Sequence, residues 1–196
     1  MPMGKRSKSK SFKAQSKEDD SRGRRSLNPA VRFVLLFLLL VIILGLLYAH
    51  LTASYHEKIA WVMDITAVLT GWIMSVVPGD SYRFGTVCVY NGFTVEIIDE
   101  CTGLLEMVIY SAAVLAFSTS IRNKLKGLAI GIPAIFVFNL VRIVVLLLVG
   151  AHSQSLFEFM HLYFWQATLI IMIAAVWIGW LYLVVFREKR MLAVPQ

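Results

Sequence analysis

An uninterrupted run of apolar residues occupies positions 33–43, Phe-Val-Leu-Leu-Phe-Leu-Leu-Leu-Val-Ile-Ile, within a longer apolar segment from Val31 to about Leu51. About 20 consecutive apolar residues form a helix long enough to cross the hydrocarbon core of a bilayer. A secretory signal peptide is the competing interpretation, but its apolar segment is usually shorter and is followed by small residues at a cleavage site. No such site follows cleanly here, so the segment predicts a membrane-spanning helix.

The composition also favours a membrane protein. Hydrophobic residues make up 58% of the 196 residues and charged residues only 16%, and a single soluble core of this length does not bury so much apolar surface. Ten of the 19 lysines and arginines lie in residues 1–32. A basic segment can bind nucleic acid, but one that directly precedes a span more often contacts anionic lipid on the cytoplasmic side. We therefore expect residues 1–28 to be a disordered basic tail whose partner is the lipid bilayer, not nucleic acid.

Three later apolar segments predict further spans, at about residues 103–118, 128–149 and 162–185. Residues 59–77 are apolar enough to span as well, but they carry several polar side chains and end at Pro78-Gly79. Between residues 82 and 98 the chain has strand character, and Asn91-Gly92 lies in the middle of this stretch. That dipeptide is typical of a two-residue β-hairpin turn, which needs positive φ twice.

The basic residues decide whether residues 59–77 cross the membrane, because lysines and arginines concentrate in cytoplasmic loops. If this segment does not cross, the N-terminus and the basic clusters at 122–126 and 187–190 all lie in the cytoplasm. If it crosses, both later clusters move outside. We therefore expect four crossings, with residues 56–77 as an interfacial or re-entrant helix on the outer side. The hairpin and the 151–160 loop then face outward too.

The predicted fold is an all-α integral membrane bundle of about four transmembrane helices, with an interfacial or re-entrant helix and a small outward-facing β-hairpin. Residues 29–190 form the membrane-embedded domain, which is also the candidate catalytic domain, and residues 191–196 form a cytoplasmic C-terminal tail. We expect it in the cell membrane, the inner or plasma membrane, as a multi-pass protein. The chain has two cysteines and no Cys-x-x-Cys spacing, and we expect neither a metal nor a cofactor.

Cys101 lies in the segment Glu100-Cys-Thr-Gly103, where the hairpin ends and a helix is predicted to begin. If Thr102 caps that helix, the thiol stands at the positive end of the helix dipole, which lowers its pKa and prepares an attacking sulfur. The alternative is a disulfide with Cys88, since both cysteines face outward. That pairing fits a non-enzymatic membrane assembly or scaffold subunit.

Arg142 lies inside a strongly apolar helix, and a charge at that depth is costly, normally paired and functional. Asn139 precedes it by three positions, so both lie on one helix face. In the functional interpretation the guanidinium stabilises a developing oxyanion or binds a substrate carboxylate. In the structural interpretation it forms a buried ion pair with Glu106 or Asp64. A third hypothesis, a small carrier with Arg142 as its anion site, lacks the broken helix pair that such carriers show.

His161 opens the last predicted span, at the same depth as Cys101. It is a candidate general acid or base, or the partner of the thiolate in an ion pair. A lone histidine at a membrane interface is more often only an interfacial polar residue, and His152 is a rival for the catalytic role. Glu106, one turn into the helix after Cys101, is placed to orient Arg142 or the histidine.

A cysteine, an arginine and a histidine on one side of the bilayer fit acyl transfer at a peptide bond. The thiolate attacks the carbonyl carbon, the histidine gives a proton to the leaving amine, and the arginine stabilises the tetrahedral oxyanion. The result is a thioester with the enzyme, which water or an external amine then resolves.

The segments 100–103, 139–143 and 159–161 (Glu-Cys-Thr-Gly, Asn-Leu-Val-Arg-Ile and Phe-Met-His) resemble the exosortase/archaeosortase family, in this order, over about residues 60–185. The resemblance implies an outward-facing site in which Cys101, Arg142 and His161 are catalytic. It also implies substrates that are exported proteins with a C-terminal tail of a short motif, a hydrophobic helix and a basic cluster. Larger members carry further spans or a fused domain, so this chain resembles the short members. The expected supporting residues are Glu100, Gly103, Glu106 and Asn139.

Overall fold

The computed structural model describes residues 28–187, so the predicted tails at residues 1–28 and 191–196 lie almost wholly outside the described part of the chain. The helices are α2 (Pro29–Ser54), α3 (His56–Met74), α4 (Leu104–Ala116), α5 (Ile121–His152), α6 (Gln154–Phe159) and α7 (Trp165–Trp180). The strands are β1 (Ser81–Phe84), β2 (Val87–Tyr90) and β3 (Phe93–Glu96). A 3-10 turn, Asp99–Cys101, precedes α4, and two π-helical segments, Met160–Phe164 and Leu181–Phe186, continue α6 and α7.

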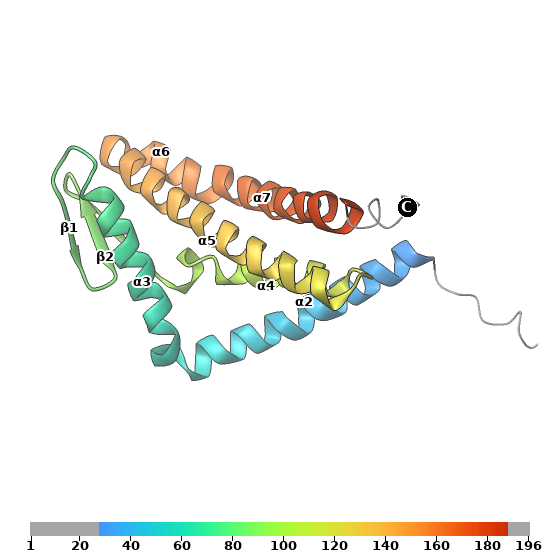
Figure 1. Cartoon of the computed structure of the whole chain (residues 1–196). Coiled ribbons are helices and arrows are strands. Elements are labelled where there is room, and N and C mark those ends of the chain that lie inside the picture. Colours follow the sequence, from blue (N-terminus) through green and yellow to red (C-terminus); the bar gives the residue numbers. More distant parts are fainter. Residues whose placement is uncertain (1–27, 188–196) are drawn as a thin grey trace, which may run out of the picture.

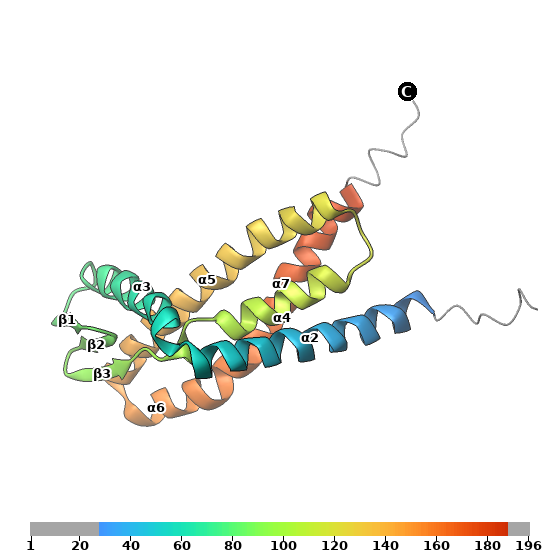
Figure 2. The same ribbon diagram turned by 90° about the horizontal axis from the view of Figure 1, so that it is seen from below.

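The helices form a membrane bundle in which α2, α4, α5 and α7 lie side by side and alternate in direction (Figures 1 and 2). Three helical segments are long and apolar enough to cross a bilayer, namely Pro29–Ser54, Ile121–His152 and Gln154–Phe186. The fourth, α4, has 13 residues and is therefore about 20 Å long, shorter than the ~30 Å hydrocarbon core. The chain is thus a multi-pass membrane protein of the predicted class, with one short crossing.

The two ends of the bundle differ in character. The start of α2, the connection from α4 to α5 and the end of the last helix lie at one end, and the sheet, α3 and α6 lie at the other (Figures 1 and 2). The basic residues Arg122, Lys124 and Lys126 belong to the first turns of α5, at the end away from the sheet. This arrangement matches the one that the charge distribution favours.

The predicted hairpin is confirmed, and it belongs to a three-stranded antiparallel sheet of order β1-β2-β3. Tyr90 pairs with Phe93 across the turn, and Asn91 and Gly92 have φ of 46° and 81°, as a two-residue turn of this kind requires. The strand β1 was not predicted as a separate element. It joins β2 through Gly85, whose φ is 60°, and lies against α3.

The sheet is held on the bundle by a buried apolar cluster that joins α3, β2 and α5. Its wholly or almost wholly buried members include Ala67, Met74, Cys88, Ile97 and Leu147. Phe93 of β3 lies directly against Gly150 of α5, where any side chain would collide with the ring. This close approach fixes β3, and the turn that follows it, relative to α5.

Candidate functional site

Cys101 is positioned by the chain reversal between β3 and α4. Its N–H donates to the Ile98 carbonyl at 3.0 Å, which closes the 3-10 turn. The prediction that Thr102 caps α4 is wrong, because its Oγ1 donates backwards to the Asp99 carbonyl at 2.6 Å. Gly103 is the N-cap instead, with φ of 78°, a conformation in which glycine avoids the steric cost of a side chain. The thiol therefore lies before the helix and not at its first residue.

The electrostatic setting of Cys101 also differs from the prediction of an activated thiolate. Burial raises the pKa of the thiol above its ordinary value, and the Glu100 and Asp99 carboxylates act in the same direction. A backbone hydrogen bond at Ile98 and the Arg142 guanidinium oppose this rise but do not cancel it. In the unliganded site the sulfur is therefore a protonated thiol at neutral pH, and attack needs a base to take its proton.

Arg142 and Asn139 lie on one face of α5, as predicted, and form a buried polar pair. The Arg142 side chain is 9% exposed, and its Nη1 donates to Asn139 Oδ1 at 3.5 Å. Asn139 is wholly buried, and its Nδ2 donates to the Cys101 carbonyl in a short hydrogen bond. Asn139 thus connects the turn that carries the cysteine to the helix that carries the arginine.

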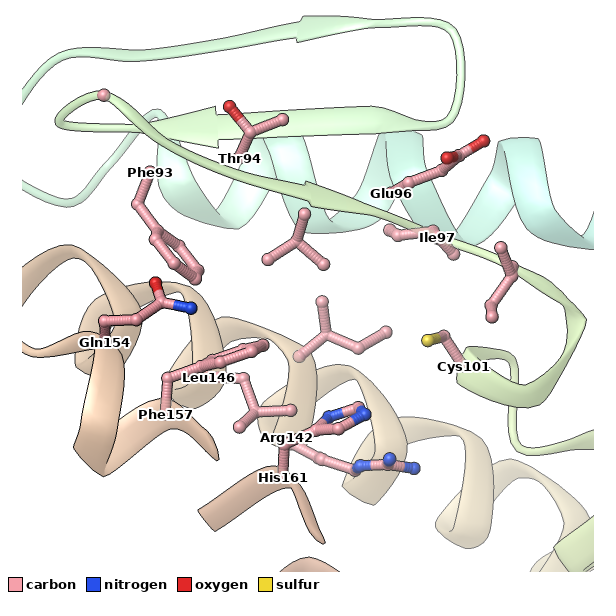
Figure 3. Close-up of a pocket in the computed structure, with 14 residues that line it drawn as sticks. Phe93, Thr94, Glu96, Ile97, Cys101, Arg142, Leu146, Gln154, Phe157 and His161 are labelled. Carbon is pink, nitrogen blue, oxygen red and sulfur yellow. The ribbon is translucent and has the colours of Figure 1, made fainter. Parts of the chain in front are cut away.

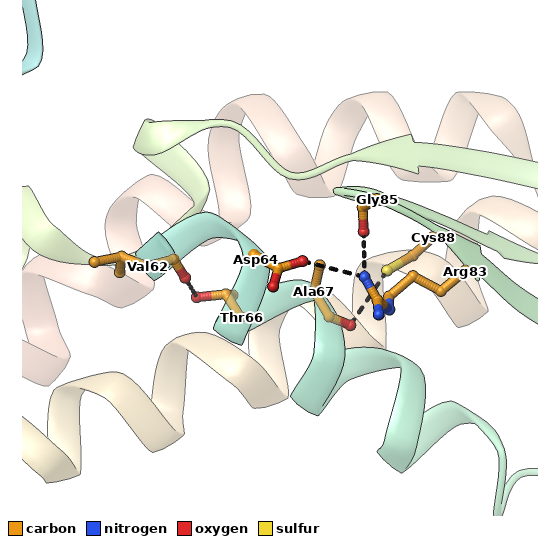
Figure 4. A network of polar contacts seen from close by, with 7 residues as sticks. All are labelled: Val62, Asp64, Thr66, Ala67, Arg83, Gly85 and Cys88. Carbon is orange, nitrogen blue, oxygen red and sulfur yellow. Dashed lines mark hydrogen bonds and ion pairs between the residues drawn. The ribbon is translucent and has the colours of Figure 1, made fainter. Parts of the chain in front are cut away.

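The structural alternative, an ion pair of Arg142 with Glu106 or Asp64, is not formed among the described residues. Asp64 of α3 pairs instead with Arg83 of β1, at 3.2 Å (Figure 4). Within residues 28–187, Arg142 Nε and Glu106 Oε2 are both buried without a hydrogen-bond partner. An unpartnered guanidinium nitrogen at this depth is costly, and such groups concentrate where a ligand supplies the missing partner.

His161 lies in the π-helical segment Met160–Phe164, an irregularity that is frequent at functional sites. Its ring stacks on Phe157, four residues earlier, with centroids 5.4 Å apart and planes 13° from parallel. The rival, His152, ends α5 and is exposed, away from the residues that line the cavity with Cys101. Of the two histidines, His161 is the one that shares a cavity with the cysteine.

Cys101, Arg142 and His161 line one cavity of about 520 Å³, between β3 and the helices α5 and α6 (Figure 3). No hydrogen bond joins these three side chains to one another in the described residues. The sequence did not point to the rest of the lining, which includes the backbone of β3, Gln154 and Phe157. For Phe157, its spacing of one helical turn from His161 was the available signal.

A second cavity of about 510 Å³ lies on the other side of Arg142 and His161, which line both. Asp99, Glu100 and Glu106 line this second cavity. Two of the predicted supporting residues, Glu100 and Glu106, therefore line the second cavity and not the one that holds Cys101. The other two, Gly103 and Asn139, support the turn at Cys101 directly.

The predicted alternative of a disulfide between Cys88 and Cys101 is wrong, since both thiols are free. Cys88 is buried in β2, and its Sγ lies 3.7 Å from the Ala67 carbonyl of α3, in a weak hydrogen bond (Figure 4). Burial raises its pKa as well. Cys88 is therefore a packed core residue and does not line the cavity that holds Cys101.

The fold and this cavity define a class of protein, a multi-pass membrane protein with a thiol, a guanidinium and an imidazole around one cavity at one end of its helical bundle. The model of the transmembrane exosortase family matches residues 22–179, and the chain belongs to that family. The resemblance inferred from the three motifs is thereby confirmed. A search of the curated proteins and a search of the solved structures each found no match.

Proposed function

We propose that this exosortase is a cysteine transpeptidase or protease that cleaves C-terminal sorting signals of exported proteins through a thioester at Cys101. Membership of the family supports action on sorting-signal proteins in general. The observation that carries the finer proposal is that Cys101, Arg142 and His161 line one cavity, although they come from three separate elements. The guanidinium's buried nitrogen without a partner adds a group that a reacting substrate can engage.

The proposed reaction begins at a thiol, because burial raises the pKa of Cys101 above its ordinary value. As the sulfur bonds to the substrate carbonyl carbon, its proton passes to the imidazole of His161, acting as general base. The carbonyl oxygen becomes an oxyanion, and an N–H of Arg142 donates to it. The carbon–nitrogen bond then breaks, and His161 returns the proton to the leaving amine.

This step leaves an acyl-enzyme in which Cys101 Sγ and the substrate carbonyl form a thioester. Water or an amine attacks that carbonyl and gives a proton to His161, which passes it to the departing sulfur. Every atom is accounted for: one carbon–nitrogen bond is lost, one carbon–oxygen or carbon–nitrogen bond is gained, and the thiol is restored.

We place the reaction at the outer face of the membrane. The basic first turns of α5 and the start of α2 lie at the end away from the sheet, and cytoplasmic ends of membrane proteins are enriched in such residues. The end that carries the sheet and the cavity is then exposed to the exported substrate. A reporter fused in the loop at residues 117–120 tests this placement, and an external signal there contradicts it.

The proposal is tested with a tail reporter, an exported protein that carries a C-terminal motif, hydrophobic helix and basic cluster taken from the same genome. Cys101→Ala, Arg142→Ala and His161→Ala should each abolish processing while the enzyme still inserts. Cys88→Ala and His152→Ala are the matched controls and should leave processing unchanged, since neither side chain lines the cavity. Full processing by Cys101→Ala ends the proposal.

A further inference from the structure

The strand β3 has one free edge, because the sheet order places it beside β2 alone. Hydrogen-bonded and non-hydrogen-bonded pairs alternate along an antiparallel pair. The Ile97 N–H donates to the Thr86 carbonyl at 3.0 Å, so Ile97 and Thr86 form a hydrogen-bonded pair. By the alternation, Thr94 and Glu96 direct their N–H and C=O groups away from β2. Across the part of the chain that the structure describes, no hydrogen bond from outside the sheet reaches these groups.

The cavity that holds Cys101 runs along this edge. It is lined by every residue from Gly92 to Ile98. Successive side chains of a strand point to opposite faces, so residues that point away from a cavity can border it only through their backbone. In β3 itself the burial alternates, with Phe93 and Val95 half-buried and Thr94 and Glu96 exposed. Thr94 and Glu96 also line the cavity although their side chains point away from it, so it is their backbone that borders the cavity (Figure 3).

The wall of the cavity opposite β3 is apolar, and Cys101 lies at one end of the cavity. Ile143 and Leu146 of α5 and Phe157 of α6 face the strand across the cavity, and Cys101 lies where the strand ends (Figure 3). Six residues of extended backbone, from 93 to 98, span about 17 Å at roughly 3.4 Å per residue. This length accepts about six residues of an extended peptide beside β3.

We infer that the substrate motif binds as a fourth strand on β3, pairing its backbone with Thr94 and Glu96 and presenting the scissile carbonyl to Cys101. The inference rests on the proposed peptide-cleaving function and names how that site holds its substrate. Unpaired backbone groups are costly at a membrane surface, and an extended peptide is the partner that satisfies a row of them. The buried Nε of Arg142, which has no hydrogen-bond partner, is a second and independent donor for a substrate in the same cavity.

Cross-linking tests the pairing without relying on catalysis. The enzyme variant is Thr94→Cys in a Cys101→Ala background, and a single cysteine is moved through successive positions of the motif in the tail reporter. Residues opposite one another in paired strands have Cβ atoms about 5 Å apart, while their neighbours point away. The strongest disulfide should therefore form at the one motif position opposite Thr94, and its two sequence neighbours should form none. Absence of cross-links, or cross-links with a spacing of three to four residues, overturns the inference.

The matched control is Ser81→Cys, on the free edge of β1 at the opposite side of the sheet. By the same alternation, Ser81 also directs its N–H away from β2, because its neighbour Tyr82 pairs with Val89 in the hydrogen-bonded set. It does not line the cavity with Cys101, so it should give no cross-link to the motif. Equal cross-linking from Ser81→Cys and Thr94→Cys contradicts a specific pairing on β3.

A second measurement uses proline, which removes a backbone N–H. Glu96→Pro deletes a donor on the free edge and spares the bonds to β2. Ser81→Pro deletes the corresponding donor of β1, together with the hydrogen bond from Ser81 Oγ to the Met74 carbonyl. Glu96→Pro should lower kcat/KM for the tail reporter about tenfold, mainly through KM, and Ser81→Pro should not. Equal kcat/KM values overturn the inference while the proposed function stands. If Cys101→Ala still processes the reporter, the proposed function fails instead.

Discussion

Gly103 is the residue at which the chain leaves the turn that carries Cys101 and enters α4, and Gly103→Ala is a sensitive perturbation of the site. Its φ is 78°, and a Cβ built there lies 3.2 Å from Cβ and Cγ of Asn139. Asn139 in turn holds the Cys101 carbonyl. Gly85 has a similar φ of 60° but nothing within 4 Å of its Cβ position, so Gly85→Ala is the matched control.

Both substitutions place a side chain at positive φ, but only Gly103→Ala also makes a close contact with a neighbour. A side chain in the left-handed region costs about 1–2 kcal/mol, so both variants should lose about that much stability. Carbon atoms prefer separations of about 3.5–4.0 Å, so at Gly103 the neighbour Asn139 must move by about 0.3–0.5 Å. A misplacement of about 1 Å at a catalytic site costs about a hundredfold in rate. Gly103→Ala should therefore process substrate about three- to tenfold more slowly.

The assay pairs the processing rate of the tail reporter in membranes with thermal unfolding of each purified variant in detergent. We expect similar losses of stability in both variants and a loss of rate in Gly103→Ala alone. If Gly103→Ala keeps the wild-type rate, the coupling from Gly103 through Asn139 to Cys101 is refuted. Equal loss of rate in Gly85→Ala refutes it too, since strain alone then accounts for the effect.

Three further predictions concern the same network. Asn139→Leu leaves the Cys101 carbonyl without its donor, so chemical denaturation should show about 2 kcal/mol less stability, and processing should fall at least tenfold. Arg142→Lys keeps the charge but loses the guanidinium, so kcat for the tail reporter should fall about a hundredfold with little change in KM. Because burial raises the pKa of Cys101, its alkylation by iodoacetamide in the free enzyme should rise steeply only at alkaline pH. In Arg142→Ala the rise in alkylation rate should move to still higher pH, because the guanidinium lowers the pKa of Cys101. An alkylation rate that reaches its plateau by pH 7 in either enzyme contradicts the raised pKa.

The positions of the three candidate catalytic residues could be predicted because they depend on topology. Cys101, Arg142 and His161 are far apart in the sequence, but each lies near an end of an apolar segment or within one, and the basic residues settle which ends share a side. The pairing of Arg142 with Asn139 followed from helical spacing alone. Such local rules and charge asymmetry need no knowledge of packing.

The parts that were missed depend on how distant elements pack. The burial that raises the pKa of Cys101 comes from the sheet and α5 closing over the turn, and no local pattern reports it. The pairing of Asp64 with Arg83 likewise required knowing that β1 lies against α3. The role of Gly103 as N-cap, in place of Thr102, follows from the sharp reversal between strand and helix. Each of these is a tertiary constraint that overrides a local preference.

The most direct test of the account is mass spectrometry of the tail reporter after processing in the presence of hydroxylamine, which intercepts thioesters. The account predicts a single new C-terminus that carries a hydroxamate with the wild-type enzyme, and neither cleavage nor hydroxamate with Cys101→Ala. The same cleavage by Cys101→Ala, or cleavage by the wild-type enzyme that hydroxylamine never intercepts, contradicts a thioester at Cys101.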